Sequence, residues 1–418
     1  MSLSKVPYRW RIVALLFSLS VVNYLDRQTL SVLAPTLREK LGFTTVQYSY
    51  IIAAFLVAYT VGYLFSGRLI DRIGVRLAVF IALAVWSAAS MLHALAAGWI
   101  ALVACRLLLG LGESFNAPAG MKAIAEWIPA RERGLCTAIF SNGNVVGAIL
   151  TPPFVSLVAL RYGWQWGFLA TGAIGFVYLI VWMTYYDSPD RQVRLTAAER
   201  EYITRERGTP FVAKQSISFL TALQHPACLG FMFARLFTDS FSYFISFWLP
   251  EYLQSARGFS LAMIGFFGWM PYLASDIGGP GGGALSDWLV RRGWKPIEAR
   301  RRMLLVAASL MPLSLVAVHA SSAAVALGLI AVLLAAQSCW NANLLTMMSE
   351  IFPRAQVATF VALSGIGGAI GGILSTLLAG RVINMTGYVP VFTVLGFLHI
   401  TAFLIINFFA LRSERRPV

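Results

Sequence analysis

The chain has 418 residues, of which 58% are hydrophobic and only 12% are charged, and its mean hydropathy is +0.71. Charged residues make up about a quarter of an ordinary soluble protein. The composition therefore excludes a soluble globular chain and indicates a polytopic membrane protein. The formal net charge of +15 does not by itself indicate a nucleic-acid partner, because basic residues in a membrane protein first mark its topology.

Apolar stretches long enough to cross a membrane recur along the whole chain. As helices of about 20 to 25 residues, they match a hydrocarbon core about 30 Å thick. We predict twelve spans, at 8–33, 46–66, 76–96, 99–125, 135–157, 165–186, 221–253, 261–285, 300–320, 323–347, 356–380 and 388–411. The first span is too long for a signal peptide and contains a charged pair, so we expect it to remain in the mature chain.

The distribution of basic residues predicts the orientation. Most of the 33 lysines and arginines fall in the segments that a cytoplasmic N-terminus would place inside, which is the bias of inner loops. We therefore expect both termini in the cytoplasm. The four cysteines lie singly in separate spans, at Cys105, Cys136, Cys228 and Cys339. This spacing favours small buried apolar residues over a disulfide framework or a metal site.

A long polar interval at 186–218 divides the chain near its middle and contains a short amphipathic segment at about 196–206. Six predicted spans lie on each side of it. We expect an N-terminal six-helix bundle at 1–186, a cytoplasmic linker at 187–220 and a C-terminal six-helix bundle at 221–418.

Two motifs recur in both halves. "GRLIDRIGVR" at 67–76 returns as "GALSDWLVRRG" at 283–293, and "EWIP" at 126–129 returns as "EIFP" at 350–353. The second pair is separated by a slightly longer interval than the first, and a longer loop around 291–300 accounts for the difference. Chance similarity of short Gly and Asp loops is the alternative. The order of the matches favours a duplicated six-helix unit, as in many secondary transporters.

These motifs and the six-plus-six layout resemble the major facilitator superfamily over nearly the whole chain. Within it, "NYLDRQTL", "CRLLLGLGESFNAPAG" and "EWIPARERG" resemble the anion:cation symporter branch, and "QYSYIIAAFLVAYTVG" is similar to its bacterial hexuronate members. The resemblance implies an all-α membrane protein with twelve transmembrane helices, built from two six-helix bundles around a central cavity. It also implies a multi-pass protein of the bacterial inner membrane.

Seven charged residues are candidates for charges kept within the membrane: Asp26, Arg27, Arg106, Glu113, Arg235, Asp239 and Asp276. Such residues are costly in a bilayer and usually face a cavity or a partner. Arg106 and Glu113 are two helical turns apart on nearly one face, which Asn116 extends. Arg235 and Asp239, one turn apart, are expected to pair with each other. Asp276, beside "GGPGGG", suggests a flexible break in the eighth span and is assigned no role.

Asp26 and Arg27 point about 100° apart on the first span, so one can face the fourth span while the other faces the cavity. A guanidinium stays charged and can hold a carboxylate through two hydrogen bonds. A buried carboxylate can change its protonation with conformation. The resemblance implies that Arg27 binds the substrate carboxylate and that Asp26 and Glu113 carry protons. Arg106, on the same face as Glu113, is our candidate for a charge relay. A static set of ion pairs between the first and fourth spans is the alternative.

Other polar residues near the expected midplane fit a site of sugar size. Tyr24, Tyr59, Asn142 and Asn341 are the candidates for substrate binding, and ordinary contacts between helices are the alternative. The repeated motifs place Asp71, Arg72, Arg76, Asp287 and Arg291 at cytoplasmic helix ends, where charge pairs can act as a gate. A purely topological role for these arginines is the alternative.

The sequence thus predicts a proton-coupled symporter that imports an organic anion by alternating access. A hexuronate is the first expectation, and an aldonate or aldarate is the alternative substrate. A passive facilitator or an efflux carrier is the alternative mechanism. We expect a functional monomer in the lipid bilayer, with no cofactor, metal or nucleic acid. The chain has no GxxxxGK[ST], HExxH or GxSxG motif, so neither an ATP-driven pump nor a membrane enzyme is favoured.

Overall fold

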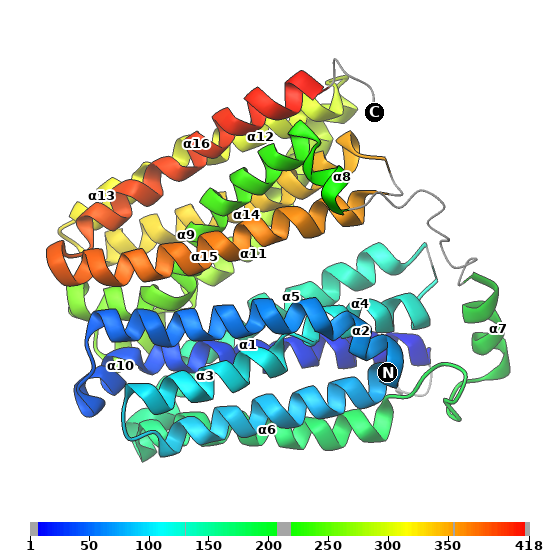
Figure 1. Cartoon of the computed structure of the whole chain (residues 1–418), viewed down its shortest axis with the longest axis horizontal. Helices are drawn as coiled ribbons and strands as arrows, with labels where there is room; N and C mark the ends of the chain where they lie inside the picture. The colour runs from blue at the N-terminus through cyan, green and yellow to red at the C-terminus, as the bar shows by residue number, and fades with distance from the viewer. Residues whose placement is uncertain (1–6, 130, 207–218, 354–355, 414–418) are drawn as a thin grey trace. The chain divides into compact units, whose positions relative to one another are not determined.

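The computed structural model describes residues 7–129, 131–206, 219–353 and 356–413, and every regular element in them is helical (Figure 1). In chain order the elements are α1 (Tyr8–Leu41), α2 (Thr45–Leu92), the 3-10 turn η2 (His93–Leu95), α3 (Trp99–Glu113), α4 (Asn116–Trp127), α5 (Arg133–Tyr162), α6 (Trp164–Tyr185), α7 (Ala197–Glu206), α8 (Phe219–Leu223), α9 (Pro226–Arg257), α10 (Leu261–Phe267), α11 (Met270–Arg291), α12 (Pro296–Leu310), α13 (Leu313–His319), α14 (Ala323–Ile351), α15 (Val357–Thr386) and α16 (Val389–Ser413). The all-α fold class predicted from hydropathy is confirmed.

The helices form two compact units. The first unit contains the described residues of Met1–Phe43, Tyr50–Val212 and Ser260–Phe267, and the second contains those of Thr44–Ser49, Ala213–Phe259 and Gly268–Val418. In the first unit α1 packs along α5, and in the second α9 packs along α15. These are the first and fifth expected spans of each half, so the two units share a packing plan.

The long helices account for the twelve predicted spans. Eight helical stretches in the described residues are long and apolar enough to cross a membrane. One of them, Thr45–Leu95, covers two predicted spans, because α2 continues across a non-helical Gly74. The remaining three predicted spans correspond to α1, α9 and α11. All three contain ionisable residues, which lower their hydropathy.

Two helix breaks differ from the expected pattern. The flexible break expected beside Asp276 is wrong, because α11 is continuous from Met270 to Arg291 with Pro280 inside it. The break lies earlier, at the junction between α10 and α11. The fourth span is also divided, since α3 ends at Glu113 and α4 begins at Asn116. Apolar composition sets the length of a span but not where its backbone turns.

The same turn ends the first helix of each expected half. Gly42 and Gly258 follow α1 and α9 with φ of 68° and 69°, a left-handed conformation in which a Cβ is unfavourable. The next helix then begins with a hydroxyl cap. Thr44 Oγ1 accepts from Gln47 N (3.1 Å) and Ser260 Oγ accepts from Met263 N (3.2 Å). Gly42 and Gly258 are separated by the same number of residues as Asp71 and Asp287, the matched positions of the repeated motif. The two glycines therefore occupy equivalent positions in the repeat.

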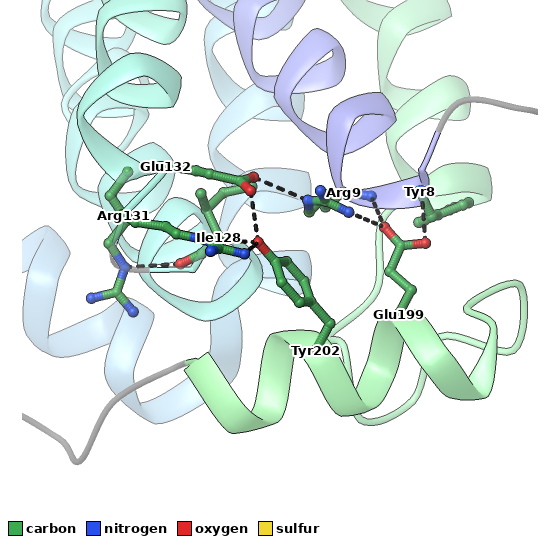
Figure 2. A network of polar contacts seen from close by, with 8 residues as sticks. Tyr8, Arg9, Ile128, Arg131, Glu132, Glu199 and Tyr202 are labelled. Carbon is green, nitrogen blue, oxygen red and sulfur yellow. Dashed lines mark hydrogen bonds and ion pairs between the residues drawn. The ribbon is translucent and has the colours of Figure 1, made fainter.

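The amphipathic segment predicted at 196–206 is the helix α7, which is tied to the start of α1 (Figure 2). The Glu199 carboxylate accepts hydrogen bonds from the backbone N of Tyr8 (2.9 Å) and of Arg9 (3.0 Å). It thus caps the first turn of α1, whose N–H groups have no partner within the helix. The Arg9 guanidinium also lies 3.4 Å from Glu199 Oε1 and 3.1 Å from Glu132 Oε2.

Glu132, in the connection between α4 and α5, completes this network. Tyr202 of α7 donates its hydroxyl to Glu132 Oε1 at 2.8 Å. Burial acts to raise the pKa of Glu132, but the hydrogen bonds from Arg9 and Tyr202 outweigh it, and the pKa is lowered from its ordinary value. A carboxyl with a lowered pKa stabilises the fold above its unfolded pKa, and this contribution is lost as the pH falls through the folded pKa. The network is therefore intact at neutral pH.

Replacing Glu199 should loosen the start of α1. Glu199→Gln keeps the length of the side chain but weakens the cap and removes the charge that faces Arg9, so we expect a loss of about 1 kcal/mol. The measurement is thermal unfolding of the purified protein in detergent, followed by tryptophan fluorescence. Glu201→Gln, at an exposed position of the same helix, is the control and should leave the melting temperature unchanged. Equal shifts in both variants would show that the cap contributes nothing.

Candidate functional site

Arg27, on α1, is the centre of the polar cluster in the first unit. Its Nε lies 2.7 Å from Glu113 Oε2 of α3, and its Nη2 donates to Asn23 Oδ1 at 3.4 Å. The side chain of Glu113 is fully buried, while that of Arg27 is 13% exposed. The pair joins the first and fourth predicted spans, and its cationic member is the one that reaches the surface.

Aromatic rings surround the guanidinium of Arg27. Its Cζ lies 4.9 Å from the ring centroids of Tyr24 and Tyr59 and 5.2 Å from that of Phe55, within the range of cation–π attraction. Tyr24 and Tyr59, both predicted substrate-binding residues, are thus brought to Arg27.

Two glycines allow the helices around this cluster to approach closely. A Cβ on Gly110 of α3 would lie 2.5 Å from the Phe55 carbonyl oxygen of α2, and one on Gly147 of α5 would lie 2.6 Å from the Tyr24 Cβ of α1. Any larger residue would push these helices apart. The positions of Tyr24 and Phe55 beside Arg27 therefore depend on small residues in neighbouring helices.

Arg106 supports the backbone of the same helix. Its Nη1 and Nη2 donate to the carbonyl oxygen of Arg27 at 3.2 and 3.1 Å. The residue is almost fully buried, and its Cζ lies 5.4 Å from the centroid of the Phe55 ring. Arg106 and Glu113 of α3 therefore both hold Arg27, one through its backbone and one through its side chain.

Asp26 lies apart from this cluster although it neighbours Arg27 in sequence. It is 1% exposed, and neither carboxylate oxygen has a hydrogen-bond partner among the described residues. A Cβ on Gly175 of α6 would lie 3.8 Å from Asp26 Oδ2 and would collide with Ser87 Oγ of α2. We expected either Asp26 or Arg27 to face the fourth predicted span, and Arg27 is the one that does so, through its contact with Glu113. Asp26 instead lies within the bundle and does not face an open cavity.

The repeated motif in the first unit forms ion pairs that the sequence did not predict. Asp71 lies 2.7 Å from Lys122 Nζ, and Arg76 Nη1 lies 2.7 Å from Asp187 Oδ2. Arg76 also donates to the Met183 carbonyl oxygen at 2.7 Å. The other three predicted gate residues are exposed: Arg72, Asp287 and Arg291.

The copy of the motif in the second unit is held by Arg300. Its Nη1 lies 2.6 Å from Asp287 Oδ1 and its Nε lies 3.2 Å from Glu350 Oε1. The sequence predicts gate roles for Asp287 and Arg291 but does not identify Arg300 or Lys122 as the partners of the two motif aspartates. The interval from Arg76 to Arg300 equals the interval from "EWIP" to "EIFP". Applying that interval to every charge in the motif would have found Arg300.

The remaining predicted site residues lie outside the Arg27 cluster. Asn142, on α5 of the first unit, and Asn341, on α14 of the second, are partly exposed. In the second unit Asn341 Oδ1 accepts from Gln337 Nε2 at 3.4 Å. The expected pairing of Arg235 with Asp239 is confirmed at 2.8 Å.

The described residues offer no group of three or more His, Cys, Asp or Glu side chains arranged for a metal ion. Cys105, Cys136 and Cys228 are buried as expected, while Cys339 is partly exposed.

Comparisons with known proteins identify similar chains. The family model described as Major Facilitator Superfamily matches residues 16–299. A hexuronate transporter of Escherichia coli K12 is 31% identical over 401 residues, which cover 95% of this chain and 93% of that protein. A galacturonate transporter of Dickeya chrysanthemi is 34% identical over 272 residues, 65% of this chain and 79% of that protein. Among solved structures, the inward-open xylose transporter of E. coli has a TM-score of 0.75 at 14% identity, covering 96% of both chains.

Proposed function

Because the chain belongs to the major facilitator superfamily, we propose that this multi-pass transporter imports a hexuronate together with protons. Transport would proceed by alternating access between six-helix halves at 1–186 and 221–418, with a functional monomer in the inner membrane and both termini in the cytoplasm. The observation that carries the proposal is Arg27, a permanent cation seated in an apolar span with part of its side chain exposed. The names of the hexuronate and galacturonate transporters support the choice of substrate.

In this proposal the substrate carboxylate binds to Arg27. The guanidinium donates to Glu113 through Nε and to Asn23 through Nη2. A planar guanidinium can also donate two parallel hydrogen bonds to a substrate carboxylate when one of these contacts is given up. The rings of Tyr24 and Tyr59 can then pack against the sugar carbons, while Asn142 and Asn341 serve its hydroxyl groups.

Glu113 couples the substrate to a proton because it shares Arg27 with the substrate. A carboxylate ligand at Arg27 competes with Glu113, and a Glu113 displaced from its cation in a buried site becomes stable only with a proton. Asp26, buried without a hydrogen-bond partner among the described residues, is the second proton carrier, and Arg106 relays the change by holding the Arg27 backbone. Loaded and empty carriers then both avoid an uncompensated buried charge.

The charge pairs of the repeated motif act as the gate in this scheme. Asp71 of one half corresponds to Asp287 of the other, with Arg72 and Arg76 near the first and Arg291 and Arg300 near the second. Ion pairs at helix ends are weak and exchangeable when exposed, and Asp71 and Asp287 are largely exposed. Such pairs suit contacts that form in one conformation and part in another.

Uptake into proteoliposomes tests the function. We expect accumulation of glucuronate or galacturonate above equilibrium when the outside is acidic, and loss of accumulation when a protonophore collapses the gradient. An aldonate and an aldarate in the same panel test the alternative substrates. Uptake that only equilibrates would instead indicate a passive facilitator, and accumulation driven by sodium at equal pH would replace the proton as the coupling ion.

Arg27→Lys keeps the charge but removes the planar fork, so we expect hexuronate affinity to fall at least about tenfold. Binding can be measured by isothermal titration calorimetry on purified protein. Arg161→Lys, at an exposed position of α5, is the matched control. Wild-type affinity in Arg27→Lys would remove Arg27 from the substrate site.

Glu113→Gln imitates the protonated side chain permanently. Because the amide can still accept a hydrogen bond from Arg27, we expect this variant to bind hexuronate and to exchange labelled for unlabelled substrate. It should fail to concentrate substrate under a pH gradient. Accumulation at the wild-type level would transfer the coupling role to another residue, with Asp26→Asn as the next variant to examine.

A further inference from the structure

A chain of three polar side chains crosses the interior of the second unit. His399 of α16 is fully buried, and its Nε2 is hydrogen-bonded to Gln337 Oε1 of α14. Gln337 Nε2 donates in turn to Asn341 Oδ1, one turn further along α14, at 3.4 Å. His399 and Gln337 are buried, whereas Asn341 is partly exposed. The chain therefore leads from the core of the unit to a group that a ligand can reach.

Aromatic rings fix the imidazole that begins the chain. The centroid of the His399 ring lies 5.2 Å from that of Trp340 and 6.0 Å from that of Phe241, at interplanar angles of 79° and 85°. Edge contacts on two sides restrict rotation of the ring. The direction of its hydrogen bond to Gln337 is therefore set by packing.

The tautomer of His399 follows from which ring nitrogen has a partner. Nδ1 has no hydrogen-bond partner among the described residues. A buried N–H without an acceptor is rarer and costlier than a buried acceptor without a donor. The proton therefore resides on Nε2, which donates to Gln337 Oε1. That donation orients the Gln337 amide so that its NH₂ group faces Asn341.

We propose that His399 is a positioning residue for substrate binding, acting through Gln337 to hold the Asn341 amide with its NH₂ group turned toward the ligand. The inference rests on the proposed function, in which Asn341 contacts the sugar acid. With Oδ1 of Asn341 turned toward Gln337, the NH₂ group lies at the other end of the amide, where it can donate to a ligand. A donor suits the hydroxyl and carboxylate oxygens of a uronate.

The position of Gln337 in the repeat gives independent support. The interval from Glu113 to Gln337 equals the interval from "EWIP" to "EIFP", so the two residues occupy equivalent positions. In the first unit Glu113 holds Arg27, and in the second Gln337 holds Asn341. The second unit thus uses an uncharged amide to orient a ligand group, where the first uses a carboxylate.

A double-mutant cycle on hexuronate uptake tests the proposal. His399→Phe keeps a ring of similar size but has no N–H group, and Asn341→Ala removes the end of the chain. We expect each single variant to raise KM about fivefold, the effect of one hydrogen bond, with little change in kcat. His399→Phe should have no further effect in the Asn341→Ala background, because there is no amide left to orient.

His399→Gln is the conservative variant, since its amide can still donate to Gln337 Oε1, and it should restore a KM near that of the wild type. If His399→Phe does not fold, as judged by size-exclusion chromatography, Gln337→Met breaks the same chain at its middle residue. It should show the same rise in KM and the same lack of additivity with Asn341→Ala.

The outcomes separate this inference from the function on which it rests. Additive effects in the cycle, or an unchanged KM in Asn341→Ala, would overturn the relay while the wild-type protein still transports hexuronate. A wild-type protein without hexuronate uptake would overturn the proposed substrate and, with it, the relay. A fall in kcat alone, not rescued by His399→Gln, would assign His399 a purely structural role.

Discussion

The first unit is organised around the burial of one guanidinium. A charged side chain at the centre of a bilayer costs at least about 2.5 to 3.5 kcal/mol on insertion scales, and Arg27 is compensated by a carboxylate, an amide and three aromatic rings contributed by α1, α2 and α3. These contacts require α3 to lie close to α2 and α5 to lie close to α1. Only small residues at the helix contacts allow these separations. Much of the packing in this part of the first unit therefore serves to compensate the charge of Arg27.

The two units satisfy their buried polar groups by different means. The first unit places an arginine against a glutamate and leaves Asp26 without a hydrogen-bond partner among the described residues. The second unit closes the Arg235–Asp239 pair within one helix, holds the buried Arg300 against Asp287 and Glu350, and adds the neutral chain of His399, Gln337 and Asn341. A neutral chain can be buried without the cost of an uncompensated charge. In the proposed mechanism, the change of charge occurs at Arg27 and Glu113 of the first unit.

The sequence predicted the number and approximate limits of the spans, because the length of an apolar stretch is a local property. It also identified Arg27, Glu113, Tyr24 and Tyr59, whose residue types are unusual for their surroundings, and the structure brings these four together. Contacts between side chains of different helices were harder to predict from the sequence, because they depend on how each helix is rotated about its axis. The pairing of Asp71 with Lys122, and the isolation of Asp26 beside Ser87 and Gly175, involve segments far apart in the chain. Hydropathy carries no information about such contacts.

The paired glycine turns at Gly42 and Gly258 bear on the history of the chain. If the halves descend from one ancestral gene, each copy has retained the same left-handed turn and the same hydroxyl cap. The chemistry has not been retained in the same way, since the interval that joins the two glycines leads from Arg27 to Tyr243. Mutation could therefore replace an ionisable group once one copy sufficed to carry it, while neither copy could lose the glycine that reverses its backbone. On that reading, the charge at Arg27 was free to change in the other copy, whereas the glycine turns and the motif charges Asp71 and Asp287 were kept in both.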